Sequence, residues 1–470
     1  MHSRRDQVEA HRFVNSRLRS ALLRAEPDAP RPPLRRTPVA LVIGGAVGLC
    51  ALGVVALLAL LPGGGGGGAG WRKPGTLIVE RETGNRYLLS AGRLRPVINY
   101  ASARLLLRDR MTVAVTSAAS LAGLRRGSPV GIVGAPDTLP PASAGDQPWL
   151  VCATPPQSTD PAGQPGVTVL VGPSVPAAEP AGEAALVRTP DGTVYLAEDG
   201  RRLRLAAPWV SRALGVDGSQ PRPVRSSWAG ALPAGPDLGS LPIARRGRPG
   251  PTVGGMPTRI GQVLAAGKPG GEDRHYLVTA GGLMQVNQTA VALALGDPAT
   301  AAAYDRAGSR ILPLSPTALA SAPTVDSAQW AADLPPLPPA LATDDADRAP
   351  CALVDTAGRT AKTAVVSLPV AAVSEAGTVD GLGLQRDSLT ADRVEVAPGG
   401  GMLARTLPAP GVPGSGLYLV VDSGAKYPVD GDTAAAALGY APSGTATVPA
   451  ALLALLPTGP VLHLLEGGGA

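Results

Sequence analysis

One uninterrupted apolar segment, residues 39–61, constrains this chain more than any other feature of its sequence. It holds no charged residue, and at about 1.5 Å per residue it would extend roughly 34 Å, enough to cross the hydrocarbon core of a bilayer. A cleaved signal peptide is the alternative, but such peptides have a short charged lead and an apolar segment of about 7–15 residues. Here the charged lead, residues 1–38, and the apolar segment, residues 39–61, are both too long for a signal peptide. We therefore expect an uncleaved transmembrane helix.

The charges around this segment predict its orientation. Residues 1–38 contain nine arginines and four acidic residues, whereas the whole chain carries a net charge of +6. The positive-inside rule places this head in the cytoplasm and the residues after the span outside it. We expect a single-pass protein of the cell (inner) membrane. The nearly neutral exterior argues against nucleic-acid binding, which requires a clustered positive face.

The head itself has the pattern of an amphipathic helix. Ser3 and Asp6 resemble a helix start, and Pro27 ends the pattern. Such a helix is too short to build a core, so it either lies on the bilayer surface or docks on a cytoplasmic partner. Within the span, Gly44 and Gly48 form a small-xxx-small pair that lets helices approach closely. The residues predicted to dock on a partner are Val8, His11, Phe13, Val14, Leu18 and Leu22.

The exported part repeats one pattern four times. Each unit has a tyrosine-led strand, a glycine turn and a second short strand, which together predict a hairpin. A small-residue helix follows, and three of the four helices end in Ala-Leu-Gly, where the glycine fits a helix C-cap. The leading tyrosines are Tyr87, Tyr195, Tyr276 and Tyr418, and the Ala-Leu-Gly segments are 213–215, 294–296 and 437–439.

Two inserts separate the repeats, and each contains one exported cysteine. Cys152 lies in the first insert and Cys351 in the second, whereas Cys50 lies within the span. An oxidising exterior favours a disulfide between the exported pair; free thiols are the alternative, and a metal site is disfavoured because no histidines cluster nearby.

The predicted fold class is α+β, with an N-terminal amphipathic helix, a single transmembrane helix, and an elongated exported domain of four hairpin-plus-helix repeats around a disulfide-clasped central core. The predicted segments are the head 1–38, the span 39–61, a Gly-rich spacer 62–73, repeat 1 (74–132), the first core insert (133–183), repeat 2 with a linker (184–257), repeat 3 (258–327), the second core insert (328–412), repeat 4 (413–466) and a tail 467–470.

Motifs for catalysis or cofactor binding are missing from the sequence. The only Gly-Lys pair, Gly267 and Lys268, is followed by Pro269 and does not fit a phosphate-binding loop. No Gly-x-Ser-x-Gly elbow and no His-Glu-x-x-His motif occurs. The exported histidines, His275 and His463, are expected to be structural. We predict no catalytic residue, no cofactor and no metal.

Several segments resemble EccB, the B component of the type VII (ESX) secretion machinery. The resemblance is carried by residues 3–13, 22, 26–28, 32 and 34–36 before the predicted span, and by residues 86–87, 92–94, 96–97 and 99–105 after it. It implies a structural subunit, present in several copies, of an inner-membrane complex that exports small helical WXG-type proteins. The implied partners are the motor ATPase EccC and the polytopic EccD, with EccE and a mycosin protease in mycobacterial systems. The family's N-terminal helix contacts neighbouring subunits, which favours partner docking by residues 8–23.

Two other functions stay open at this point. The exterior repeats of the family have been likened to a cell-wall-binding module, so the chain could be a membrane-anchored wall binder acting alone. Some family members carry an ATPase label, which would make the chain a nucleotide hydrolase. Loss of residues 1–38 would abolish the function of a scaffold and matter little to a lone wall binder.

Overall fold

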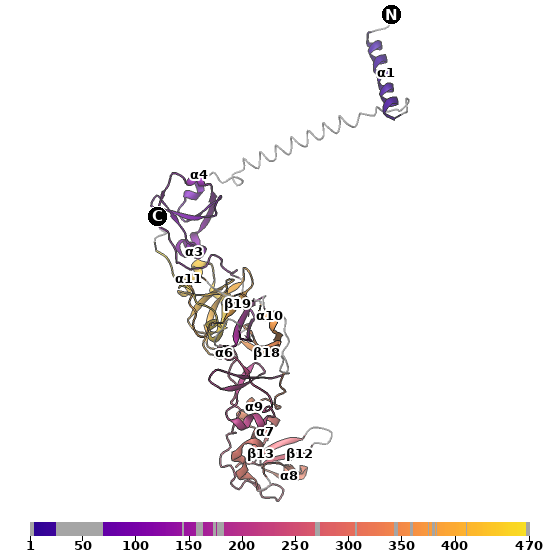
Figure 1. Ribbon diagram of the computed structural model, residues 1–470, viewed down its shortest axis with the longest axis vertical. Helices are drawn as coiled ribbons and strands as arrows, with labels where there is room; N and C mark the ends of the chain where they lie inside the picture. Colours follow the sequence, from indigo (N-terminus) through magenta and orange to yellow (C-terminus); the bar gives the residue numbers. More distant parts are fainter. Residues whose placement is uncertain are drawn as a thin grey trace.

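The computed structural model describes residues 4–24 and 69–466, apart from 143–144, 157–162, 173–174, 176–182, 268–272, 306–307, 343–345, 358–360, 375, 378–380, 382 and 410. The predicted span, with Gly44, Gly48 and Cys50, lies outside these residues. None of the helices that the structure describes is long and apolar enough to cross a bilayer. From residue 69 onward the chain forms an elongated body of mixed α and β structure (Figure 1).

The predicted N-terminal helix is present as α1 (Arg4–Arg24). Five of its apolar side chains are at least half exposed, Val8, Phe13, Val14, Leu18 and Leu22. An α-helix turns by about 100° per residue, so Val8, His11, Val14, Leu18 and Leu22 share one stripe, whereas Phe13 lies about 140° around from Val8. Phe13 therefore lies on a different face of α1 from the other five residues predicted to dock, and docking by the six residues stays a prediction.

The first sheet, which we call sheet 1, is a three-stranded meander with one parallel strand added on each side. Its hairpin turns at Ala91 and Gly92, both with positive φ, and pairs Ser90 with Arg93. This is the two-residue turn that matches the twist of the flanking strands. Its order is β4-β1-β2-β3-β5, made of β1 (Thr76–Glu80), β2 (Arg86–Ser90), β3 (Arg93–Pro96), β4 (Thr112–Thr116) and β5 (Arg125–Arg126). Its helices are η1 (Ala69–Arg72), α3 (Tyr100–Leu107), η2 (Arg108–Arg110) and α4 (Ala118–Leu121).

Sheets 2 and 3 have related connectivity, because an antiparallel meander is followed by a helix and then by a strand parallel to the first. Sheet 2 contains β8 (Ala185–Arg188), β9 (Val194–Glu198), β10 (Arg201–Arg204), β11 (Arg222–Pro223), α5 (Pro208–Ala213) and α6 (Ser226–Ala231). Sheet 3 contains β12 (Val263–Ala266), β13 (Arg274–Val278), β14 (Leu283–Val286), β15 (Ile311–Leu314), β16 (Thr324–Val325), α7 (Gln288–Gly296), η4 (Pro298–Ala303) and α8 (Pro316–Ser321); α9 (Gln329–Asp333) follows it.

Sheet 4 begins earlier than the sequence indicates. Its first strand, β20 (Gly401–Leu407), falls in the segment 328–412 that we had assigned to the core, but it pairs antiparallel with β21 (Leu417–Val421). The leading tyrosine stands in the second strand of every meander, so a repeat boundary predicted from the tyrosine falls one strand late. Sheet 4 also contains β22 (Lys426–Val429), β23 (Ala446–Pro449), α11 (Gly431–Leu438), η5 (Pro442–Gly444) and α12 (Ala450–Ala454).

The two inserts together form one central sheet of order β18-β17-β6-β7-β19. Cys152 and Cys351 stand directly opposite each other on its antiparallel strands β6 and β17, both are fully buried, and they form the disulfide. The predicted bridge is therefore present, and it joins residues 199 positions apart. The central strands are β6 (Trp149–Thr154), β7 (Gly166–Val171), β17 (Arg348–Asp355), β18 (Lys362–Pro369) and β19 (Arg393–Val396), with α10 (Val370–Ser374) on the disulfide side.

Hydrophobic packing joins these sheets into a row. One core runs through one face of the central sheet and sheet 4, with Trp149 and Trp228 among its fully buried side chains. The Trp228 ring N–H of α6 donates to the Pro350 carbonyl of β17, at 3.1 Å, and so ties sheet 2 to the central sheet. A second core joins sheet 2 to sheet 3. Sheets 1 and 3 form the two ends of the body (Figure 1).

Candidate functional site

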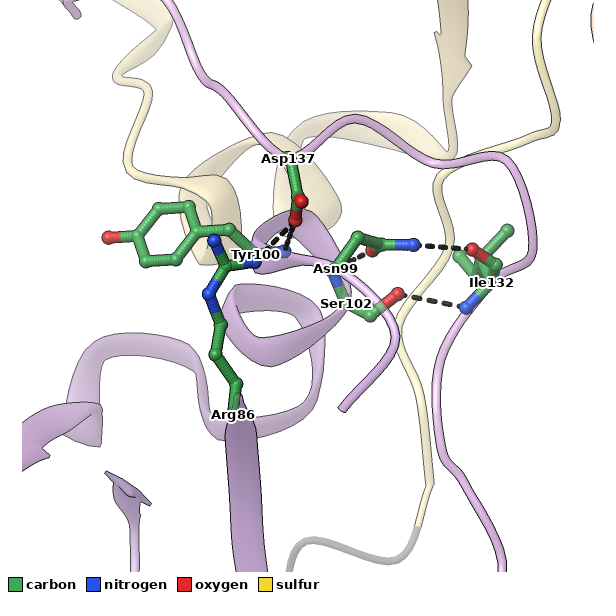
Figure 2. A network of polar contacts seen from close by, with 6 residues as sticks. All are labelled: Arg86, Asn99, Tyr100, Ser102, Ile132 and Asp137. Carbon is green, nitrogen blue, oxygen red and sulfur yellow. Dashed lines mark hydrogen bonds and ion pairs between the residues drawn. The ribbon is translucent and has the colours of Figure 1, made fainter. Parts of the chain in front are cut away.

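The segment 99–105 that carries the family resemblance begins helix α3 in sheet 1. Asn99 is buried, and its side-chain oxygen accepts from the Ser102 backbone N–H at 2.9 Å, which caps the helix. Its side-chain amide donates to the Ile132 carbonyl at 2.7 Å. Ser102 completes the arrangement, because its hydroxyl accepts from the Ile132 N–H at 2.8 Å. Figure 2 shows both side chains reaching Ile132 from the first turn of the helix.

Asp137 holds the other end of the same loop. Its carboxylate accepts from the Tyr100 N–H at 2.9 Å and from the Arg86 guanidinium of β2, as drawn in Figure 2. The segment 130–137 is therefore fixed to the N-terminus of α3 at both of its ends. These contacts set where the chain leaves sheet 1 for the central sheet.

Helix α3 in turn packs against α11 of sheet 4 (Figure 1). Gly439 follows α11 with a φ of +104°, and a Cβ there would lie 2.7 Å from Nη2 of Arg104. The Tyr440 hydroxyl donates to the Pro140 carbonyl at 2.8 Å, and burial raises the pKa of this tyrosine. The family motif thus builds the junction between the first and last sheets of the body.

The equivalent helices of sheets 2 and 3, α5 and α7, also pack against each other. Here Gly296 is the last residue of α7, and a Cβ would lie 2.4 Å from the Cβ of Ala213. The predicted C-cap role holds for Gly439, which has left-handed φ, but is wrong for Gly296, where glycine allows close helix contact instead.

A buried ion pair, Arg246 with Asp297, joins the C-terminus of α7 to the loop that contains Leu241. Burial alone would raise the pKa of Asp297, but hydrogen bonds from the Arg246 guanidinium and the Ala299 N–H outweigh it and hold the pKa below its usual range. Both side chains are largely buried, at 3% and 11% exposure. No short-range pattern signals this pair, because its partners lie 51 positions apart.

The two histidines that follow the predicted span do not meet at a site. His275 is half-buried on β13, while His463 is exposed and contacts the Val461 carbonyl at 3.3 Å. Within the described ranges no group of three or more His, Cys, Asp or Glu residues could hold a metal ion. The packed helix pairs, α3 with α11 and α5 with α7, are junctions between sheets of the same chain.

The comparisons with known proteins agree with this architecture. A family model described as "Type VII secretion system ESX-1, transport TM domain B", EccB, matches residues 1–466. The chain belongs to the EccB family. The EccB relative "ESX-5 secretion system ATPase EccB5" of Mycobacterium tuberculosis is 30% identical over 98% of this chain and 92% of its own length. "ESX-3 secretion system ATPase EccB3" of Mycolicibacterium smegmatis is 29% identical over 97% of this chain and 89% of its own.

Solved EccB-containing structures have the same fold. A chain in the structure of an intact ESX-5 inner membrane complex matches with a TM-score of 0.67 at 27% identity, covering 99% of this chain and 95% of that one. A chain of the EccB3 dimer from the ESX-3 core complex matches with a TM-score of 0.66 at 26% identity, covering 84% of this chain and all of that one. The recognition of an EccB protein from residues 3–13 and 86–105 is thereby confirmed.

Proposed function

We propose that this chain is a structural subunit of an inner-membrane type VII secretion complex. In that complex it would scaffold the assembly of a motor ATPase and a polytopic subunit, EccC and EccD, for export of small helical WXG-type proteins. The observation that carries the proposal is the likeness to a chain of an intact ESX-5 inner membrane complex over 99% of this chain. EccE, a mycosin protease and further copies of this chain are proposed neighbours.

The exposed stripe of α1 supports docking at the cytoplasmic end. Val14 and Leu18 are each more than half exposed on one face of the helix. A free helix with an apolar stripe of this kind gains stability by covering it, either with a protein or with lipid. We assign the stripe to a neighbouring subunit, the single span to residues 39–61 with Gly44 and Gly48 as its packing face, and the four sheets to four exterior repeats around the disulfide-bonded core.

We assign this chain no catalytic function, although EccB relatives are named ATPases. Its Gly267-Lys268-Pro269 segment lacks the serine or threonine that a phosphate-binding loop requires. Purified full chain should therefore not turn over ATP. Any residual activity that survives Lys268→Ala at the same rate would point to a contaminating enzyme.

Purification of the tagged full chain from its own host in mild detergent tests the scaffold. We expect a large assembly that contains the motor and polytopic subunits. A lone monomer would overturn the proposal and favour the wall-binding alternative.

Val14→Glu together with Leu18→Glu should release the cytoplasmic partners, because both changes put charge on the apolar stripe. Ser16→Glu is the matched control, since Ser16 is exposed and lies about 80° from Val8, outside the stripe.

A further inference from the structure

The charge of the exported part is strongly divided along the chain. The segment 69–137, which contains sheet 1, holds eleven basic and four acidic residues, whereas the rest of the chain from 138 holds 22 basic and 28 acidic residues. The net charges of the two regions nearly cancel, so the net charge of all residues after the span gives no sign of a basic face. The interpretation of the exterior as lacking a clustered positive face was wrong for the unit next to the predicted span.

Strand register gathers this charge at one end of sheet 1. The strands β1 and β4 run parallel with Thr76 beside Thr112, and β3 and β5 run parallel with Arg93 beside Arg125. Because β2 is antiparallel to both β1 and β3, all four of the other strands start at the same end of the sheet. We call this end, with the residues just before each strand, the basic end; its basic residues are Arg72, Lys73, Arg93, Arg108, Arg110, Arg125 and Arg126.

The basic end is open to solvent and barely neutralised. All seven side chains are exposed, and Asp109 is the only acidic residue among them. Arg126 is the least free of the seven, because its guanidinium lies 4.8 Å from the centre of the Tyr87 ring and, after the hydrogen bond from Thr83, helps to lower the pKa of Glu80. Of the other three acids in the unit, Glu80 and Glu82 lie at the far end of the strands, and Asp137 pairs with Arg86 there. Arg93 and Arg125 stand directly opposite each other, an arrangement of like charges that destabilises a sheet. Among the described residues neither has a carboxylate partner. An anion between them would relieve the repulsion.

The chain also enters sheet 1 at this end. Helix η1 leads directly into β1, and only residues 62–68 separate it from the predicted span. Seven residues reach at most about 25 Å when fully extended. We propose that the basic end binds the anionic phospholipid headgroups of the outer leaflet and so sets the body on the membrane surface. This rests on the proposed membrane anchoring by residues 39–61, and it adds a second, electrostatic contact to that anchor.

Hydrogen exchange on the full chain in lipid nanodiscs tests the proposal. We compare discs of phosphatidylcholine alone with discs that also contain phosphatidylglycerol, and follow the backbone amides of 69–75, 91–95 and 122–127. At about 50 mM salt we expect about tenfold slower exchange in the anionic discs, and most of this protection should be lost at about 500 mM salt, where the screening length is far shorter. Equal exchange in both kinds of disc would overturn the proposal.

Two further arms separate the sources of the effect. Lys73→Gln, Arg93→Gln and Arg125→Gln together should abolish the lipid-dependent protection, whereas Arg212→Gln, Arg274→Gln and Lys362→Gln, which remove three exposed charges elsewhere, should leave it unchanged. Inorganic phosphate added to neutral discs should not reproduce the protection; if it does, the site takes free phosphate and the membrane contact is refuted. Co-purification of the first triple variant with its complex reports separately on the proposed function.

Discussion

Asn99→Asp should loosen the loop that connects sheet 1 to the central sheet while leaving helix α3 capped. The aspartate keeps an oxygen for the Ser102 N–H, 2.9 Å away, but cannot donate to the Ile132 carbonyl, now 2.7 Å from the amide nitrogen. Asn99 is only 4% exposed, so water cannot easily replace the lost donor. Leaving a buried acceptor unpaired costs about 1–3 kcal/mol. Asn99→Ala also loses the cap, about 1 kcal/mol more.

Local hydrogen exchange of the full chain is the suitable assay, because a chain with several packed units does not unfold in one step. Since about 1.4 kcal/mol changes an equilibrium tenfold, exchange in 130–137 should rise about 5- to 150-fold in Asn99→Asp, with α3 little changed. Asn287 caps α7 in the same way and donates to the Ala331 and Leu334 carbonyls, so Asn287→Asp is a matched control that should loosen the segment 329–334 and not 130–137. Unchanged exchange in 130–137, or equal loosening of α3, would refute this reasoning.

Three further predictions concern the core and the helix junctions. Cys152→Ser with Cys351→Ser should lower the free energy of unfolding of the central sheet by up to about 5 kcal/mol, because the loop it closes is long, and reductant should produce the same loss only in the wild type; denaturation of both forms checks this. Gly296→Ala should cost about 1–3 kcal/mol because its Cβ overlaps that of Ala213, and adding Ala213→Gly should restore the melting temperature. Burial and the neighbouring Asp199 charge raise the pKa of Glu198 to about 6. The ionised carboxylate therefore lowers the free energy of unfolding, fully above about pH 6 and not at all below about pH 4.5, where Glu198 is protonated in both the folded and the unfolded chain. Glu198→Gln should accordingly stabilise the chain at pH 7.5 by about 1 kcal/mol, after allowance for solvent screening, and have no effect at pH 4; a gain at both values contradicts the assignment.

Local patterns predicted the elements that depend on neighbouring residues. The hairpin turns at Ala91-Gly92 and Asp199-Gly200 follow from glycine in left-handed backbone, and the capped start of α3 follows from Asn99. The Cys152–Cys351 pairing was accessible because only two cysteines follow the predicted span. The start of sheet 4 was missed because β20 has no tyrosine-led signal and is recognised only by its pairing with β21.

Other features of the structure depend on contacts between segments that are distant in the sequence. The role of Gly296 depends on Ala213, which belongs to another sheet, and the partner of Asp297 is 51 positions away. The basic end was hidden for the same reason, since net charge adds residues along the chain and ignores which strands start side by side. No periodicity within one segment carries that information.

The sequence by itself determined that this chain has a candidate membrane span, an N-terminal amphipathic helix, a series of hairpins and helices after the span, and one cysteine pair among them, because each of these is encoded by composition or short-range spacing. Tertiary structure alone decided which helices join the sheets, α3 with α11 and α5 with α7, and where the charge of sheet 1 gathers. The physical reason is that packing and strand register bring together residues whose separation in the chain is set by the fold, and short-range spacing cannot report it.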